Sequence, residues 1–259
     1  MSQPHPPSPA IGLVAHRGYA LHYPENTVLA LRAAAEAGAD AVELDIQFSR
    51  DGVPVVIHDP DLQRTAKLSG RIDTLPWSAL LGTSVHEPER FGERFAGEPL
   101  VNLRDACNAL LDYPDLQVFI EVKGETVPPE RLPELVTATL EHSAALGNRR
   151  TLISFMDGVV PLARNAGTQA GWVLPLWSAE TLAHAHTLAP DFLFCNRDLL
   201  PAGAKPLPQG SWQWAVYEVA CAEEALALAR RGVGWVESMQ VAELRRALQT
   251  AQADSRGNP

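Results

Sequence analysis

Two acidic side chains, Glu43 and Asp45, alternate with apolar residues in the segment 41–48. Because successive side chains of a β-strand point to opposite faces, these two carboxylates share one face and lie roughly 7 Å apart. Glu121 and Lys123 share a face in the same way at the end of a later apolar run. Buried carboxylates are costly unless a cation neutralises them. The pattern therefore indicates acids that converge on a cation.

Three carboxylates at the ends of neighbouring strands offer hard oxygen ligands, which suit Mg²⁺ or Ca²⁺ better than zinc. In barrels of parallel strands, the carboxyl ends of the strands are where active sites form. We therefore predict one divalent cation, Mg²⁺ or Ca²⁺, held by Glu43, Asp45 and Glu121. The alternative is a structural ion-pair lattice in which Glu121 pairs with Lys123 or with Arg17.

Two of the eight histidines, His16 and His58, follow apolar segments and have a charged neighbour, Arg17 and Asp59 respectively. The other six are expected in loops or on helices. Imidazole titrates near neutral pH, so two histidines beside a cation can divide general acid and general base catalysis. The fixed charges of Arg17 and Lys123 suit a phosphate oxygen more than a neutral substrate.

The tetrapeptide at 24–27 is typical of a helix start, with Asn26 or Thr27 as the N-cap and an acid near the positive end of the helix dipole. We expect these residues to be structural, with Glu25 also able to orient Arg17. This interpretation links the loop after the first strand to the charged residues that the strand presents.

Aromatic residues lie at or just beyond the ends of later strands, where they could form an apolar wall for a substrate. They are Phe155, Trp177 and Trp214. Packing in the core explains the same residues equally well. Of these, Phe155 and Trp214 are predicted to contact the substrate.

Short apolar runs alternate with helical patterns along the whole chain. The strands are predicted at 11–15, 41–48, 118–122, 151–155, 170–174, 191–195, 212–217 and 233–237, and the helices at 26–37, 102–111, 130–146, 157–166, 179–188, 222–231 and 239–249. The Pro-rich segment 198–209 replaces one helix. Eight strands, each followed by a helix or its substitute, predict an α/β fold of the (β/α)₈ TIM-barrel type, with an open doubly wound sheet as the alternative.

A further strand at 53–58 follows the second strand after a turn that contains Asp51-Gly52, so we expect an antiparallel hairpin. A turn centred on residues 50–51 places His58 opposite Glu43, and a turn centred on 51–52 places it opposite Asp45. The next 40 residues, about 60–100, are irregular. A small insertion of this length inside a compact domain is unusual unless it covers a site, here the barrel mouth.

The 259 residues include 31 acidic and 21 basic side chains, which give a formal net charge of −10. No run of Lys or Arg exceeds a pair, so a partner that is a nucleic acid is excluded. The composition is 46% hydrophobic and 20% charged, as in folded soluble proteins. No segment has the ~20 uninterrupted apolar residues of a membrane span. The predicted partner is therefore a small molecule, and the sequence leaves the oligomeric state open.

Three widely spaced cysteines argue against a disulfide framework and favour a reducing compartment. The first residues lack the basic and apolar regions of a secretion signal, so we expect a cytoplasmic location. A single domain is predicted over 10–250. The Pro-rich residues 1–9 and the polar residues 251–259 are predicted to be flexible tails.

The chain resembles the glycerophosphodiester phosphodiesterase family, a group of metal-dependent barrel enzymes, in an ordered set of motifs. They are His16-Arg17-Gly18, Pro24-Glu25-Asn26-Thr27, Glu43-Leu44-Asp45, Asp51-Gly52 before Val55-Val56-Ile57-His58-Asp59, Asp61-Leu62-Gln63-Arg64-Thr65, Glu121-Val122-Lys123 and Ile153-Ser154-Phe155. One tripeptide would mean little, but this set follows the family's order over about residues 11–155.

The resemblance implies an enzyme of lipid and glycerol metabolism that hydrolyses a glycerophosphodiester to sn-glycerol 3-phosphate and an alcohol. Attack by the glycerol 2-hydroxyl through a cyclic phosphate is one implied route. The family pattern assigns the metal ligands Glu43, Asp45 and Glu121, the proton-transfer residues His16 and His58 in either order, and the phosphodiester-binding residues Arg17 and Lys123.

The last third of the chain departs from the family pattern. Trp214-Ala215-Val216-Tyr217 stands where the family tends to have Trp-Thr-Val-Asn. The run Gly232-Val233-Gly234-Trp235-Val236-Glu237-Ser238-Met239-Gln240-Val241 stands where the family often has a Gly-Val-Asp strand that leads into Thr-Asp-x-Pro. Two alternatives therefore stay open. One is a lyase on the same scaffold that releases a cyclic phosphate, and the other is a barrel that binds phosphodiesters without catalysis.

Overall fold

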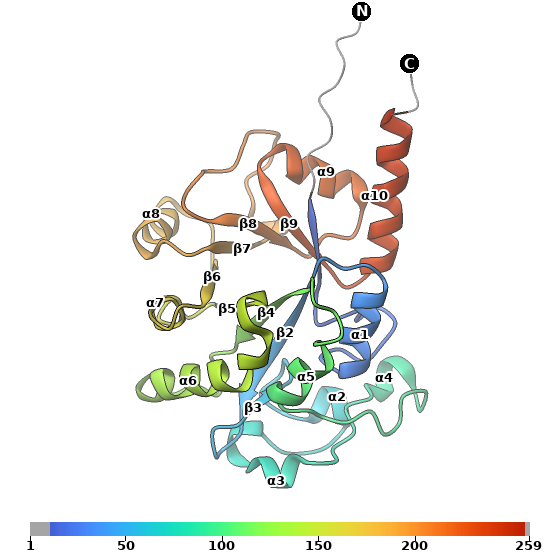
Figure 1. Cartoon of the computed structure of the whole chain (residues 1–259), viewed down its shortest axis with the longest axis vertical. Coiled ribbons are helices and arrows are strands. Elements are labelled where there is room, and N and C mark those ends of the chain that lie inside the picture. Colours follow the sequence, from blue (N-terminus) through green and yellow to red (C-terminus); the bar gives the residue numbers. More distant parts are fainter. Residues whose placement is uncertain (1–10, 257–259) are drawn as a thin grey trace, which may run out of the picture.

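The computed structural model describes residues 11–256, which form a closed barrel of parallel strands surrounded by helices (Figure 1). The parallel strands are β1 (Gly12–Ala15), β2 (Ala41–Phe48), β4 (Gln117–Val122), β5 (Arg150–Ser154), β6 (Gln169–Val173), β7 (Phe192–Asn196), β8 (Gln213–Tyr217) and β9 (Val233–Ser238). Strand β1 pairs with both β2 and β9, which closes the sheet. The predicted (β/α)₈ barrel is confirmed, and the open doubly wound alternative is wrong.

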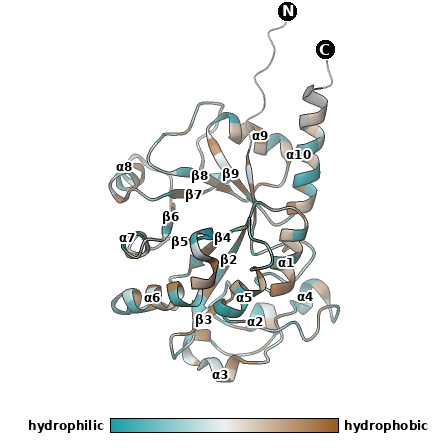
Figure 2. Ribbon diagram, in the orientation of Figure 1, coloured by the Kyte–Doolittle hydropathy of each residue, from teal (hydrophilic) through white to brown (hydrophobic). Residues whose placement is uncertain are grey.

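The outer helices follow the strands in the expected order. They are α1 (Val28–Glu36), α5 (Leu103–Ala109), α6 (Leu132–His142), α7 (Val159–Asn165), α8 (Ala179–Leu188), α9 (Ala222–Arg230) and α10 (Val241–Arg256). Short 3₁₀ turns are η1 (Ile72–Thr74), η2 (Pro129–Arg131), η3 (Ala144–Arg149) and η4 (Arg197–Leu199). Figure 2 shows hydrophobic and hydrophilic residues interleaved along helices such as α6 and α10, as expected for helices with one face on the barrel.

The C-terminal helix is longer than the sequence pattern predicts. We expected it to end at residue 249 and the chain to be flexible from 251, but α10 continues to Arg256. Neither Gly nor Pro occurs between Val241 and Arg256 to stop the helix. The predicted tail at 1–9, and the last three residues of the one predicted at 251–259, lie outside the described residues. Within the described part of the chain, no helix combines the length and hydropathy that a bilayer span requires.

Strand β3 (Pro54–Val56) pairs antiparallel with the end of β2, in the register Ile46↔Val56. Three residues, 50–52, connect Ser49 to Val53, whose carbonyl accepts a hydrogen bond from the Ser49 amide at 3.1 Å. Both predicted registers are wrong, because each assumed a turn with a two-residue centre. The residue level with Asp45 is instead Ile57, whose amide donates to the Asp45 carbonyl at 3.0 Å.

The barrel interior is filled by aromatic rings below the level of the acids. Phe119 packs edge-on against Phe192 and Phe194, with centroids 5.1 Å away in both cases, and against Trp235 at 5.9 Å. A Cβ added at Gly171 would lie 2.9 Å from Ile153 Cγ2, so a small residue is needed there. The interior next to Phe119 is therefore packed with apolar side chains.

Segment 60–100 contains three short helices, α2 (Gln63–Ala66), α3 (Trp77–Leu80) and α4 (Pro88–Phe91), which lie beside β3 and α1 (Figure 1). Its apolar side chains form a small core of their own with β3. Polar contacts join it to the loop after β1. Arg64 donates to Glu25 at 2.6 Å and to Asp59 at 2.7 Å, and Glu87 accepts from the Glu25 amide at 2.9 Å.

We expect Phe119→Ala to lower the free energy of unfolding by about 3–5 kcal/mol, because it removes the ring at the centre of this packed interior. Urea denaturation followed by circular dichroism measures the change. The matched control is Leu81→Ala, at a side chain that is 60% exposed. It should change stability by no more than about 0.5 kcal/mol. Equal effects of the two variants would contradict the packing described here.

The Arg64 contacts predict a stability that depends on acid pH. Burial opposes ionisation of Asp59, but hydrogen bonds from Arg64 and His58 prevail and lower its pKa to about 2. An unfolded aspartate titrates near 4. Since the folded value is lower, the stabilisation is complete above about pH 4 and is lost as the pH falls from there through about 2.

Arg64→Met should therefore destabilise the protein by about 1–3 kcal/mol at pH 7 and flatten the loss of stability between about pH 4 and 2. Thermal melting across that pH range tests both effects. Arg71→Met is the control, because Arg71 forms an exposed pair with Asp73. We expect this control to melt as the wild type does at every pH.

Candidate active site

The turn after β1 positions His16 and Arg17 at the carboxyl end of the barrel. Arg17 and Gly18 have left-handed backbone angles, with φ of 56° and 78°. A Cβ at position 18 would lie 2.6 Å from the carbonyl carbon of Ala30, so the close approach of this turn to α1 requires glycine. The Arg17 amide donates to Glu43 Oε2 at 3.0 Å, which ties the turn to β2.

The three predicted metal ligands come together at this end of the barrel. Carboxylate oxygens of Glu43, Asp45 and Glu121 all lie within 4.8 Å of one another. Glu43 and Asp45 are each 1% exposed, and Glu43 Oε1 is buried without a hydrogen-bond partner in the described part of the chain. Burial and then the charge of Asp45 raise the pKa of Glu43 well above its usual value, and raise that of Glu121 to about 7.

Two cations accompany the acids. Arg17 Nε lies 3.2 Å from Asp45 Oδ2, and Lys123 Nζ lies 3.0 Å from Glu121 and 3.6 Å from Asp45. Burial would raise the pKa of Asp45, but the charges of Arg17 and Lys123 lower it. The pairing of Glu121 with Lys123 matches the structural alternative.

Glu43 takes no part in these ion pairs, and it forms no other ion pair within the described residues. Three acids therefore face two cations, and the oxygen left over on Glu43 points to a missing positive charge. Carboxylate oxygens are the ligands that Mg²⁺ and Ca²⁺ prefer. The donor set consequently fits the predicted divalent cation, in addition to the ion pairs that are already formed.

The tetrapeptide at 24–27 does more than start a helix. Thr27 is the N-cap of α1, and its hydroxyl accepts from the Ala30 amide at 3.1 Å. Asn26, the other candidate, instead binds Asp45 twice: its amide group donates to Oδ2 at 2.9 Å and accepts from the backbone amide at 3.0 Å. Glu25 pairs with Arg17 at 3.0 Å, as expected. The loop thus orients Asp45, a predicted metal ligand, and the neighbouring Arg17.

Each of the two predicted catalytic histidines has a carboxylate at Nδ1. His58 lies 2.7 Å from Asp59, and its carbonyl accepts from Gln47 Nε2 at 2.8 Å. His16 lies 2.6 Å from Glu218. A carboxylate at Nδ1 fixes the ring orientation and leaves Nε2 available to exchange a proton. This arrangement is compatible with the predicted role of both imidazoles in proton transfer.

The pKa of His16 is raised above its usual value. Burial alone would lower it, but the charge of Glu237 and the hydrogen bond to Glu218 outweigh burial. Glu218 is itself held in place, since its second oxygen accepts from the Met239 amide at 2.6 Å. Glu218 is thus a positioning residue for His16.

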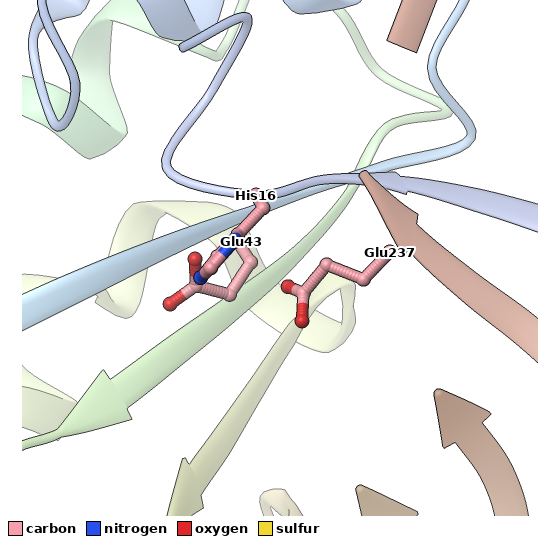
Figure 3. Close-up of side chains that lie close together, drawn as sticks. All are labelled: His16, Glu43 and Glu237. Carbon is pink, nitrogen blue, oxygen red and sulfur yellow. The ribbon is translucent and has the colours of Figure 1, made fainter. Parts of the chain in front are cut away.

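Sequence reasoning missed both Glu218 and Glu237. Glu237 lies on β9, is 3% exposed, and joins His16 and Glu43 in a group whose ligand atoms lie within 4.8 Å of one another. Figure 3 shows its carboxylate directed toward the other two side chains. The period of two that identified Glu43 also places Glu237 on the inner face, so the signal was present. Glu218 follows the end of β8 and carries no comparable signal.

The predicted aromatic wall is only partly in place. Phe155 is 45% exposed and its ring lies 6.0 Å from Lys123 Nζ, at the mouth. Trp214 is a correction, because it is 1% exposed and points away from the barrel interior. It stacks on Trp177 at 5.6 Å and donates to the Pro208 carbonyl at 2.8 Å. Trp214 packs between strand and helix and does not line the site.

Solved structures with the same fold confirm the architecture. A phosphodiesterase from Oleispira antarctica, in complex with the product sn-glycerol-3-phosphate, superposes with a TM-score of 0.78 over 93% of this chain and 97% of that chain, at 21% identity. A glycerophosphodiester phosphodiesterase from Thermotoga maritima gives a TM-score of 0.68 over 91% and 97%, at 23% identity. At these identities the likeness establishes the fold alone.

Curated relatives are similar over part of the chain. Human glycerophosphodiester phosphodiesterase 1 is 33% identical over 154 residues, which are 60% of this chain and 45% of that protein. A glycerophosphodiester phosphodiesterase from Caldanaerobacter subterraneus is 37% identical over 134 residues, or 51% and 53%. The chain spans about half the length of the curated relatives that it matches. Residues 16–253 match the family model described as "Glycerophosphoryl diester phosphodiesterase family", and the chain belongs to that family.

Proposed function

We propose that this protein is a metal-dependent enzyme that hydrolyses glycerophosphodiesters to sn-glycerol 3-phosphate and an alcohol. Membership of the family supports the reaction class. The observation that carries the proposal is the grouping of Glu43, Asp45 and Glu121 at the end of the barrel where His16 and Arg17 also lie. Such a set supplies cation ligands, a proton-transfer group and a phosphate-binding charge together.

One divalent cation, Mg²⁺ or Ca²⁺, is held by Glu43, Asp45 and Glu121 in this proposal. When bound, such an ion polarises a phosphoryl oxygen and stabilises the charge that develops on it. The hydrogen bonds of Asn26 to Asp45 keep that ligand oriented. Lys123, which lies between Glu121 and Asp45, keeps these two acids close together before the ion binds.

The proton transfers are assigned to His16 and His58, one as general base and the other as general acid. Both Nδ1 atoms are occupied by carboxylates, so Nε2 of each ring exchanges the proton. Glu218 and Asp59 also stabilise the imidazolium that forms when either ring accepts a proton. Such a pair can deliver a proton to the leaving alcohol and take one from the nucleophile.

Arg17 and Lys123 bind the phosphodiester, whose oxygens they approach as fixed positive charges. Phe155, exposed beside Lys123, offers an apolar surface to a part of the substrate that carries no charge. A cytoplasmic location completes the proposal, and it is supported by three free cysteines, one of them, Cys221, exposed.

The experiment that tests the proposal is an assay of a panel of glycerophosphodiesters with Mg²⁺, Ca²⁺, Mn²⁺ or a chelator, with products identified by phosphorus NMR. We expect sn-glycerol 3-phosphate to form only when an ion is present. A cyclic phosphate that accumulates without glycerol 3-phosphate would show the lyase reaction instead. Substrate binding without turnover under every condition would show a binding protein.

We expect His16→Gln and His58→Gln each to lower kcat by roughly 10²-fold or more, because each removes one proton-transfer group. The control is His184→Gln, at a surface histidine that pairs with Asp157 and lies outside the proposed site. Steady-state kinetics at saturating Mg²⁺ measures all three variants. Either catalytic variant with near wild-type kcat refutes the role of that histidine.

We expect Lys123→Met to lower kcat/KM by about 10²-fold, through a lower kcat and a weaker affinity for the anionic substrate. The matched control is Lys67→Met, which removes a lysine that pairs with Glu89 on the surface. Ordinary kinetics in Lys123→Met would mean that Lys123 serves only the ion pairs with Glu121 and Asp45.

A further inference from the structure

The Glu237 carboxyl group is buried beside His16 and has no ligand or proton-transfer role in the proposed reaction. It is 3% exposed, and its Oε1 has no hydrogen-bond partner in the described part of the chain. Glu43 Oε1 is also buried without a partner in the described part of the chain, and carboxylate oxygens of the two residues lie within 4.8 Å of each other. Neighbouring buried carboxylates are unfavourable unless a cation lies close to both.

His16 completes a set of three ligands around this space (Figure 3). Ligand atoms of His16, Glu43 and Glu237 all lie within 4.8 Å of one another. Zinc bonds of about 2.0–2.2 Å place tetrahedral ligands about 3.5 Å apart, so side-chain movements of about 1 Å bring the three ligands onto one ion. The hydrogen bond between His16 Nδ1 and Glu218 is the arrangement that orients metal-binding histidines, and it leaves Nε2 for the ion.

We propose that His16, Glu43 and Glu237 form a second cation site that takes Zn²⁺. The set differs from that of Glu43, Asp45 and Glu121 in chemistry, because it includes an imidazole nitrogen, which suits zinc better than Mg²⁺ or Ca²⁺. Glu43 is common to both sets. Two-ion sites have the ions about 3.5–4 Å apart, which is close enough for them to share one carboxylate.

Zinc at this site inhibits the enzyme, a consequence that rests on the proposed function. The Nε2 atom of His16 is the one assigned to proton transfer, and its lone pair cannot bind zinc and accept a proton together. The form with both ions is therefore inactive even when the first site is filled. We expect zinc to inhibit without displacing the activating ion.

The test begins with metal-free wild-type protein loaded with one equivalent of Mn²⁺, whose free form gives a quantitative EPR signal. Zn²⁺ is then added while EPR, calorimetry and hydrolysis are followed. The proposal requires one equivalent of zinc to bind without release of Mn²⁺, with activity lost over the same titration. Release of Mn²⁺ in a one-to-one exchange, or no zinc binding, overturns it.

The variant Glu237→Gln keeps the shape of the side chain and removes its charge. It should bind zinc at least about 10-fold more weakly and shift inhibition to higher zinc by the same factor, relative to its own activity without zinc. Retention of one Mn²⁺ shows that the variant is folded. Glu125→Gln is the matched control, since Glu125 belongs to neither ligand set, and it should bind zinc as the wild type does.

Anomalous diffraction from wild-type crystals soaked in zinc tests the same site with no variant. A zinc peak bonded to His16 and Glu237 supports the proposal, and a peak on Asp45 and Glu121 alone contradicts it. Different results would refute the second site and the proposed function. If a divalent ion activates hydrolysis but zinc displaces that ion, only the second site is refuted. If hydrolysis needs no ion, the proposed metal-dependent function is refuted.

Discussion

The interaction on which this molecule depends is the attraction between buried acids and the cations that make their burial tolerable. Glu43, Asp45, Glu121 and Glu237 all project into the mouth of one barrel. On the other side of these acids, the barrel interior holds the packed rings of Phe119, Phe192 and Phe194. Positive charges that neutralise these carboxylates therefore lie at the mouth of the barrel, where Arg17 and Lys123 are found.

Side chains of the protein supply part of this positive charge, through a continuous series of ion pairs and hydrogen bonds. It runs from His58 to Asp59, Arg64, Glu25, Arg17 and Asp45, and its contacts measure between 2.6 and 3.2 Å. His58 is thereby connected to Asp45, one of the buried acids, through Arg64 in the segment 60–100. This gives the insertion a definite structural role, because Arg64 is the member that joins the two ends.

The sequence predicted those features of the structure that follow from a periodic pattern of residues. The period of two placed Glu43, Asp45 and Glu121 on the inner face, and the strand count predicted the barrel. The same period assigns Trp214 to the outer face, with Ala215 inside, so that residue was misjudged by its nearness to a strand end. The hairpin register could not be derived, because a single added turn residue shifts every pairing after it.

Contacts between distant segments were beyond any local pattern. The side chain of Asn26 could cap a helix or bind Asp45, and only the approach of the first loop to β2 decides between them. The partner of Glu218 could not be predicted either, since Glu218 and His16 form a hydrogen bond although they are 202 residues apart in the sequence. Residue types can reveal that polar groups converge, but the partner of each group is set by packing.

Charge balance connects the proposed reaction with the second cation site. With one divalent ion, the acids Glu43, Asp45 and Glu121 and the cations Arg17 and Lys123 carry one net positive charge, which matches the single negative charge of a phosphodiester. The field at the mouth is thus local, and the overall charge of −10 does not repel the substrate. Glu237 is a further acid beside this first set and lowers the sum of charges to zero. A second divalent cation beside Glu237 offsets that acid, but because the cation also binds His16, it removes the group that transfers the proton.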